Sequence, residues 1–246
     1  MKNRNLAIEI LEKKRRLDSS KDPVDHIYGR LYDISLLENF YEEVLTNNFF
    51  DRSEISSALE IYNSAFFEGI KYIPVSLVAC IESFFRLVFA RTIDADPFYK
   101  INAAKFDIKF SLQAAIDLDA HNLSIGEFIS HLLKASNIND IDSNMSQILG
   151  ENYLTNFKKW RKKLDMQEEL FPIADSDKDA DILGKLDRLF KLRHCICHEA
   201  FTQITREDYR DLVSFTPSVM KLLTVTEKYV EEHISLTKSR KFDDSN

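Results

Sequence analysis

The sequence contains few residues that break helices. Only 5 of its 246 residues are glycine and 5 are proline, whereas apolar residues make up 44%. Sheets and irregular loops need more turn residues than this. We therefore predict an all-α protein, with enough apolar residues for a packed interior.

Cysteine is scarce as well, and no long apolar run stands out. The chain has three cysteines, Cys80, Cys195 and Cys197. An odd number of cysteines does not make a disulfide framework and fits a reducing compartment. We expect no membrane span, because no apolar run of about 18 residues is evident. The basic, polar N-terminus lacks a hydrophobic signal core, so we expect a cytoplasmic location.

Excess positive charge is also missing, because the net charge is −7. The whole molecule is therefore not drawn to nucleic acid, and any RNA binding must use a local patch. Two patches are candidates. One is a basic row at three-residue spacing, and the other interleaves basic residues with an aromatic, as suits phosphate contact and base stacking. Their residues are Lys185, Arg188 and Lys191 in the row, and Lys158, Lys159, Trp160 and Arg161 in the cluster. A surface anchor is the alternative for the cluster.

Apolar residues recur at three- and four-residue spacing along most of the chain, which predicts helices. Pro74 fits the first turn of a helix, Pro217 is placed to kink the last one, and Asn122, Asn137 and Gly150 mark helix ends. The tail from Lys238 is polar and expected to fray. The predicted helices cover residues 3–17, 24–47, 53–72, 75–93, 103–118, 125–135, 140–148, 151–165, 179–199 and 206–233.

The helix over 75–93 is apolar on nearly all sides, so it should be central. Glu82 and Arg86 lie four residues apart within it and can pair with each other. They are either a structural ion pair or residues that orient a functional site.

The candidate site is the stretch from Leu192 to Glu199, which concentrates an arginine, two histidines and two cysteines. His194 and His198 are four apart, so one helical face carries both imidazoles. Arg193 is turned about 140° from His198 on a straight helix. A site that uses both must lie where the helix is distorted, or it must receive side chains from a second copy of the chain.

The pattern of Arg193, the polar residue His194 and then His198 resembles the R-x(4–6)-H motif of the HEPN superfamily, whose members are helical nucleases and nucleotide-binding proteins. The segment from Pro74 to Arg86 resembles an early core helix of such domains. The resemblance covers residues 53–95 and 178–235, and residues 97–176 look like a helical insertion. It implies one domain over 1–246, with an antiparallel bundle of four long helices (53–72, 75–93, 179–199 and 206–233) and extra N-terminal helices.

The resemblance implies a metal-independent endoribonuclease without a cofactor. RNA carries its own nucleophile, the 2′-hydroxyl, so the enzyme needs only proton transfer and a positive group. We assign proton transfer to His198, phosphate anchoring to Arg193 and a supporting role to His194. Cleavage should give a 2′,3′-cyclic phosphate. HEPN domains dimerise with their motif helices facing each other, so we expect a homodimer. A toxin or antiviral-defence role follows from the resemblance, and an antitoxin or other regulatory partner would fit it.

Three other interpretations stay open. His194 and His198 have a spacing common among zinc ligands, but Cys195 and Cys197 project away from the histidine face and no second Cys/His cluster completes a site. The protein could also be a non-catalytic HEPN-like RNA-binding, nucleotide-binding or interaction protein. Finally, the motif residues could be surface residues of an ordinary helix. No glycine-rich phosphate loop or Ser–His–Asp arrangement supports ATP or acyl-transfer chemistry.

Overall fold

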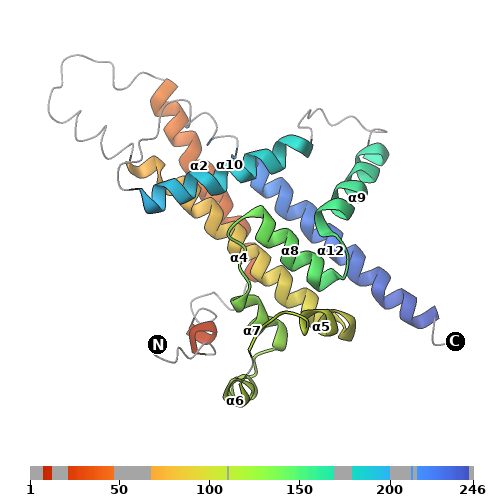
Figure 1. Ribbon diagram of the computed structural model, residues 1–246. Helices are drawn as coiled ribbons and strands as arrows, with labels where there is room; N and C mark the ends of the chain where they lie inside the picture. Colours follow the sequence, from red (N-terminus) through yellow and green to blue (C-terminus); the bar gives the residue numbers. More distant parts are fainter. Residues whose placement is uncertain are drawn as a thin grey trace, which may run out of the picture. The chain divides into compact units, whose positions relative to one another are not determined.

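The computed structural model describes residues 8–12, 22–46, 68–109, 111–168, 179–199, 212 and 215–243. These residues form helices and connecting turns and contain no strand, which confirms the all-α prediction. The main helices (Figure 1) are α2 (Pro23–Thr46), α4 (Tyr72–Ala95), α5 (Pro97–Ala103), α6 (Leu112–Ala120), α7 (Ile125–Leu132), α8 (Ile138–Leu149), α9 (Tyr153–Glu168), α10 (Asp179–His198) and α12 (Phe215–Asp243).

The chain forms two compact units. Unit 1 contains residues 1–26, 82–177 and 223–246, and unit 2 contains residues 27–81 and 178–222. Boundaries between the units fall inside α2, α4 and α12. The helix predicted over 53–72 lies mostly outside the described residues, and so does the first part of the one predicted over 206–233. The four-helix core and the 97–176 insertion stay predictions.

Helix α4 supplies fully buried side chains to both units. Pro74 lies in its first turn, as predicted, where a missing N–H breaks no intrahelical hydrogen bond. Ile73, Leu77 and Ile81 are buried in unit 2, and further along α4 Phe84, Phe89 and Ile93 are buried in unit 1. Burial of each such side chain contributes about 1.5–3 kcal/mol, so α4 is a major source of stability.

The same helix corrects the statement that no apolar run of about 18 residues is present. Residues 68–95 contain an 18-residue window with a mean hydropathy of 1.8, enough by length and composition alone. The run was missed because Glu82 and Arg86 interrupt it. That window is 61% buried inside the structure, as is common for the core helix of a folded protein.

Short helices of unit 1 begin and end at recognisable local signals. The Asn137 side chain accepts a hydrogen bond from the Asp140 N–H and caps α8, and Ser124 forms a capping box with Glu127 at the start of α7. Gly150 ends α8 with a φ of 74°, and Asn122 has a φ of 51°. The predicted positions of Asn122, Asn137 and Gly150 at helix boundaries are confirmed.

The helix predicted over 103–118 was wrong. Helix α5 already ends at Ala103 and α6 begins only at Leu112. The reason lies in two local signals. Asp96 caps α5 and Pro97 occupies its first turn, so this helix starts early. Residues 105–109 then alternate polar and apolar side chains, a period of two that does not favour a helix.

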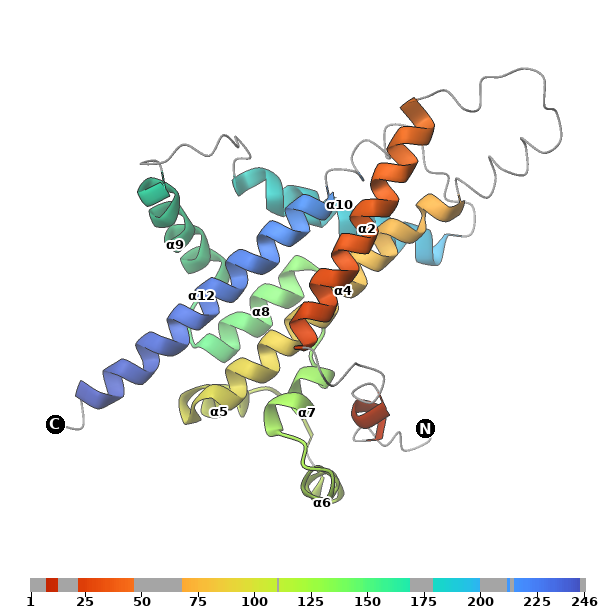
Figure 2. The ribbon, with the colours of Figure 1, turned by 180° about the vertical axis from the view of Figure 1, so that it is seen from behind.

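One expectation for the last helix was also wrong. The kink predicted at Pro217 stays a prediction, because residues 213–214 lie outside the described residues. Helix α12 is described from Phe215 onward. The helix continues to Asp243, past the tail expected to fray from Lys238. In unit 1, Arg91 of α4 pairs with Glu227 and Glu231 of α12 at 3.2 and 3.0 Å. Figure 2 shows α9 and α12 side by side from behind.

A buried carboxyl group joins α2 to the start of α12 inside unit 2. Glu38 is only 3% exposed and its Oε1 accepts a hydrogen bond of 2.7 Å from the Thr216 hydroxyl. Burial raises the pKa of Glu38 to about 7, and the Thr216 hydrogen bond partly opposes this. The native state therefore keeps a proton that the unfolded chain releases near pH 4.5.

We predict that Glu38→Gln flattens part of the dependence of stability on pH. The wild-type free energy of unfolding should fall as pH rises from about 4.5 to about 7, by at most about 3 kcal/mol, because the folded state binds the proton more tightly. Glutamine keeps an acceptor for Thr216 but has no charge. Denaturant titrations at several pH values should show the variant gaining stability relative to wild type as pH rises. Glu42→Gln, an exposed position on the same helix, is the control. A constant difference across this range would contradict the prediction.

Candidate functional site

Helix α10 is anchored by its first half and exposed at its end. Ile182, Leu186, Leu189 and Phe190 are buried in unit 2 at helical spacing. None of residues 191–199 is buried. Leu192 and Ile196, predicted to continue the apolar face, are half-buried. The last two turns of α10, which contain the motif, therefore lie outside the buried core.

The motif histidines lie on one face, as their spacing predicts. The rings of His194 and His198 are 4.6 Å apart between centroids and tilted by 47°, and both side chains are exposed. Arg193 is half-buried. Helix α10 stays α-helical through His198, so Arg193 and His198 remain about 140° apart around its axis. One straight α10 therefore does not aim both groups at one point.

The histidine pair lacks further ligands for a metal ion in the part of the chain that the structure describes. There, no group of three or more histidine, cysteine, aspartate and glutamate side chains gathers closely enough to hold a metal. Cys197 is exposed, Cys195 is half-buried, and neither forms a disulfide bond within the described residues.

Glu82 and Arg86, predicted to pair, approach within 4.0 Å between Oε2 and Nη2. The Nε atom of Arg86 is buried and has no hydrogen-bond partner among the described residues. Both residues belong to unit 1, whereas the motif belongs to unit 2. Their role in orienting the motif stays a prediction.

The basic row on α10 is partly engaged in local contacts. Arg188 and Lys191 are exposed and Lys185 is half-buried. The Lys191 ammonium group lies 2.6 Å from an Asp187 carboxylate oxygen one turn earlier. Such an exposed pair contributes little to stability, so Lys191 can exchange this partner for a phosphate.

The second basic cluster divides into exposed and buried members. Lys158 and Lys159 of α9 are exposed, but Arg161 is only 5% exposed and does not belong to a surface patch. It follows Phe157, also buried, by one helical turn, so both lie on the inward face of α9. Trp160 is half-buried, and its Nε1–H donates a 2.7 Å hydrogen bond to Glu232 of α12.

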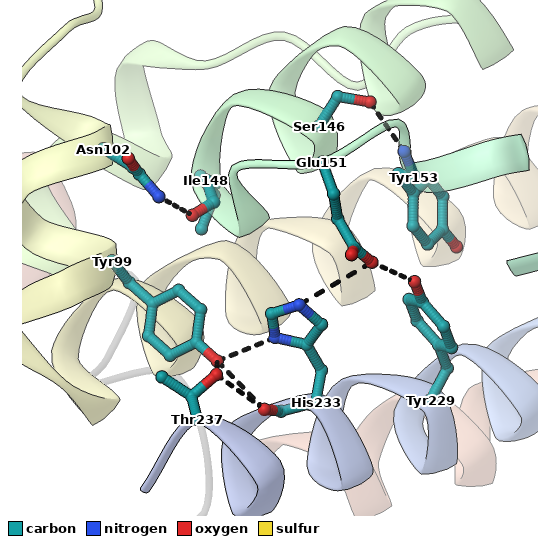
Figure 3. Close-up of polar contacts among 9 residues, drawn as sticks. All are labelled: Tyr99, Asn102, Ser146, Ile148, Glu151, Tyr153, Tyr229, His233 and Thr237. Atoms are coloured by element: carbon teal, nitrogen blue, oxygen red, sulfur yellow. Dashed lines mark hydrogen bonds and ion pairs between the residues drawn. The ribbon is translucent and has the colours of Figure 1, made fainter. Parts of the chain in front are cut away.

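The sequence analysis missed a polar network that joins α5, α12 and the turn after α8 (Figure 3). Glu151 accepts a 2.5 Å hydrogen bond from the Tyr229 hydroxyl and lies 3.6 Å from Nε2 of His233. The other ring nitrogen of His233 lies 2.8 Å from the Tyr99 hydroxyl. Burial and the Glu151 carboxylate raise the pKa of Tyr229. The four-residue spacing of Tyr229 and His233 was the only local signal for this network.

Comparison with known proteins identifies the class. A family model described as RiboL-PSP-HEPN matches residues 54–226. The match covers more than half of the chain, so this protein belongs to the RiboL-PSP-HEPN family, within the HEPN superfamily. The matched range includes Arg193, His194 and His198, and it also runs through residues 97–176. No curated protein and no solved structure matches the chain.

We predict that the thiols differ sharply in reactivity, which tests the exposure of the end of α10. Burial raises the pKa of Cys80 to about 11, with the Arg30 charge opposing it, whereas Cys197 is exposed. The thiolate is the reactive form, so a rise of two pKa units slows alkylation of Cys80 on the order of 100-fold. Iodoacetamide labelling of the native protein, read by mass spectrometry, should modify Cys197 first. Cys197→Ser should remove the fast label and Cys80→Ser should not. Equal rates at Cys80 and Cys197 would refute the exposure of the motif.

Proposed function

We propose that this protein is a metal-independent endoribonuclease that acts in the cytoplasm. The observation that carries the proposal is the family match, whose range contains Arg193 and His198 in the R-x4-H pattern. Membership in the HEPN superfamily supports an RNase-like function, since HEPN domains are often ribonucleases. The exposure of His194 and His198 at the end of α10 is compatible with access by a large substrate.

The proposed reaction uses only groups of the protein and the RNA. The 2′-oxygen attacks the adjacent phosphorus and loses its proton to a base, while the bond to the 5′-oxygen breaks and that oxygen takes up a proton. The products are a 2′,3′-cyclic phosphate and a 5′-hydroxyl. His198 transfers protons, because an imidazole exchanges them near neutral pH. Arg193 binds two phosphate oxygens and stabilises the charge that develops on them. His194 assists at the same face.

A homodimer completes the site in this proposal. Arg193 and His198 diverge around one α10, so Arg193 of one protomer would act with His198 of its partner. The exposed residues Arg188 and Lys191 would hold the RNA backbone beside the motif, with Lys185. A second RNA contact is formed by Lys158, Lys159 and Trp160. Arg161 is not part of it, because its side chain is buried. Glu82 and Arg86 are proposed to support the site, and a toxin or antiviral-defence role with a regulatory partner fits such an enzyme.

One observation favours a second candidate, a HEPN-like protein that binds RNA or nucleotides without cutting. Among the described residues, no hydrogen bond fixes the ring of His194 or His198. A catalytic imidazole is usually oriented by a hydrogen bond to its second nitrogen. In the proposed enzyme, the partner protomer or the bound RNA would supply this bond.

We predict that Arg193→Ala and His198→Ala each lower RNA cleavage by about 10²-fold or more, because loss of one acid–base group alone has this effect. Thermal unfolding should change little, since neither side chain is buried. The measurement is a cleavage time course with single-stranded RNA in excess EDTA. Cys197→Ser, an exposed change between the two residues, is the matched control and should retain activity. Full activity of both alanine variants would leave the non-catalytic candidate.

Mixing the two inactive variants tests the shared site. In a mixed dimer, the wild-type arginine of the His198→Ala chain meets the wild-type histidine of the Arg193→Ala chain. The mixture should therefore regain cleavage after subunit exchange, although each variant alone stays inactive. A mixture of dimers that exchanges subunits and stays inactive would show that each site uses one chain only.

A further inference from the structure

Unit 1 contains a pocket of about 590 Å³ that uses none of the motif residues. It lies between α9, the C-terminal half of α12, the turn after α8 and Phe98 of α5. This volume is within the range of small-molecule sites in proteins. The pocket has an apolar part, which includes Phe98 and Leu236, and a charged part contributed by α9 and α12.

Helix α9 turns one face toward the pocket. Asn156, Lys159, Trp160 and Lys163 line it, at positions three and four residues apart that share one side of a helix. Lys158 and Lys162 are equally exposed but do not line the pocket. The basic character of α9 is therefore divided between a pocket face and an outer face.

The two carboxylates at the pocket already have partners in the protein. Glu232 accepts the hydrogen bond from the indole of Trp160. Glu151 accepts the hydrogen bond from Tyr229 and faces His233, as Figure 3 shows. Both carboxylates therefore already accept a hydrogen bond from a side chain of the pocket.

The two lysines differ in this respect. Among the described residues, neither Lys159 nor Lys163 makes an ion pair or a hydrogen bond. Their attachment points are one helical turn apart, about 6 Å along the axis, so both ammonium groups can reach one phosphate. The carboxylates accept hydrogen bonds from Trp160 and Tyr229, whereas the two ammonium groups have no partner among the described residues. The two lysines can therefore bind an anionic ligand.

The aromatic side chains favour a flat ring on that ligand. Trp160 packs against Phe157 and against the edge of Tyr229, with ring centroids 6.3 and 5.3 Å apart, yet stays half-exposed at the pocket. Its hydrogen bond to Glu232 holds the indole in place. A fixed, partly open indole offers a surface on which a base can stack.

We propose that this pocket binds a nucleoside monophosphate, with its base against Trp160 and its phosphate on Lys159 and Lys163. The nucleotide comes either from solution or from a single-stranded RNA, as one unstacked residue. The proposal deepens the second RNA contact of the proposed function, to which Lys159 and Trp160 also belong. It involves only unit 1 and neither Arg193 nor His198, so it can be tested apart from cleavage.

The single tryptophan makes the test direct, because Trp160 is the only tryptophan in the chain. We expect adenosine 5′-monophosphate to quench its fluorescence in a saturable titration. Adenosine lacks the phosphate and ribose 5-phosphate lacks the base. Each should bind with an affinity at least about tenfold lower than that of adenosine 5′-monophosphate. Lys159→Gln and Lys163→Gln should each weaken binding by about tenfold. Lys162→Gln is the matched control, since Lys162 is an exposed lysine of the same helix that does not line the pocket, and it should bind as wild type.

The two sources of the nucleotide are separated with a single-stranded hexaribonucleotide, titrated into the His198→Ala protein. Tighter binding of the hexanucleotide, with competition by the monophosphate, assigns the pocket to RNA. Tight binding of the monophosphate alone assigns it to a free nucleotide. The proposal is overturned if neither probe quenches Trp160 up to about 1 mM, or if Lys162→Gln weakens binding as much as Lys159→Gln and Lys163→Gln. RNA cleavage by wild-type protein is measured separately, so that result would leave the proposed nuclease intact.

Discussion

The apolar surface of α4 must be kept from water, and each unit covers its own part of this helix. A helix that is apolar on nearly all sides cannot lie at the surface of a folded protein without a large cost. Unit 2 also buries Leu31 of α2 and Leu189 of α10 completely. Unit 1 likewise buries Met145 and Ile148 of α8. The composition that resembles a membrane span is thus that of a core helix.

Two buried polar groups of this interior, on Glu38 and Tyr153, have hydrogen-bond partners. The Glu38 carboxyl group accepts a hydrogen bond from the Thr216 hydroxyl. The buried Tyr153 hydroxyl lies 3.2 Å from the hydroxyl of Thr226. An unpaired buried group would cost several kcal/mol. The polar groups at the end of α10 are not buried. The buried first half fixes the helix, and the motif extends beyond the core, where a charged substrate can approach it. The division of α10 into an anchor and an exposed end links the fold to the proposed chemistry.

Local signals allowed much of the fold to be predicted, and the failures have physical causes. The end of α8 requires a residue with a positive φ, which glycine adopts more easily than other residues. A glycine at position 150 therefore predicts the helix end from the sequence. The bounds of the helix over 103–118 were wrong because residues 105–109 are partly apolar but alternate with a period of two, which does not favour a helix. The burial of Arg161, like the network around Glu151, depends on contacts with residues distant in the sequence. The motif itself could be predicted, but the exposure of its residues required the structure.

The central claim is that the RNA cuts itself with its own 2′-hydroxyl while protein side chains move protons and stabilise charge. The most direct measurement uses an RNA oligonucleotide that is cleaved at one position, compared with the same strand carrying a single 2′-deoxynucleotide on the 5′ side of the cut. Removal of one hydroxyl leaves the overall charge and the base unchanged. The single-deoxy strand should resist cleavage at that position, and the all-ribose strand should end in a 2′,3′-cyclic phosphate. Cleavage of both strands at the same rate, with a different end, would contradict the claim.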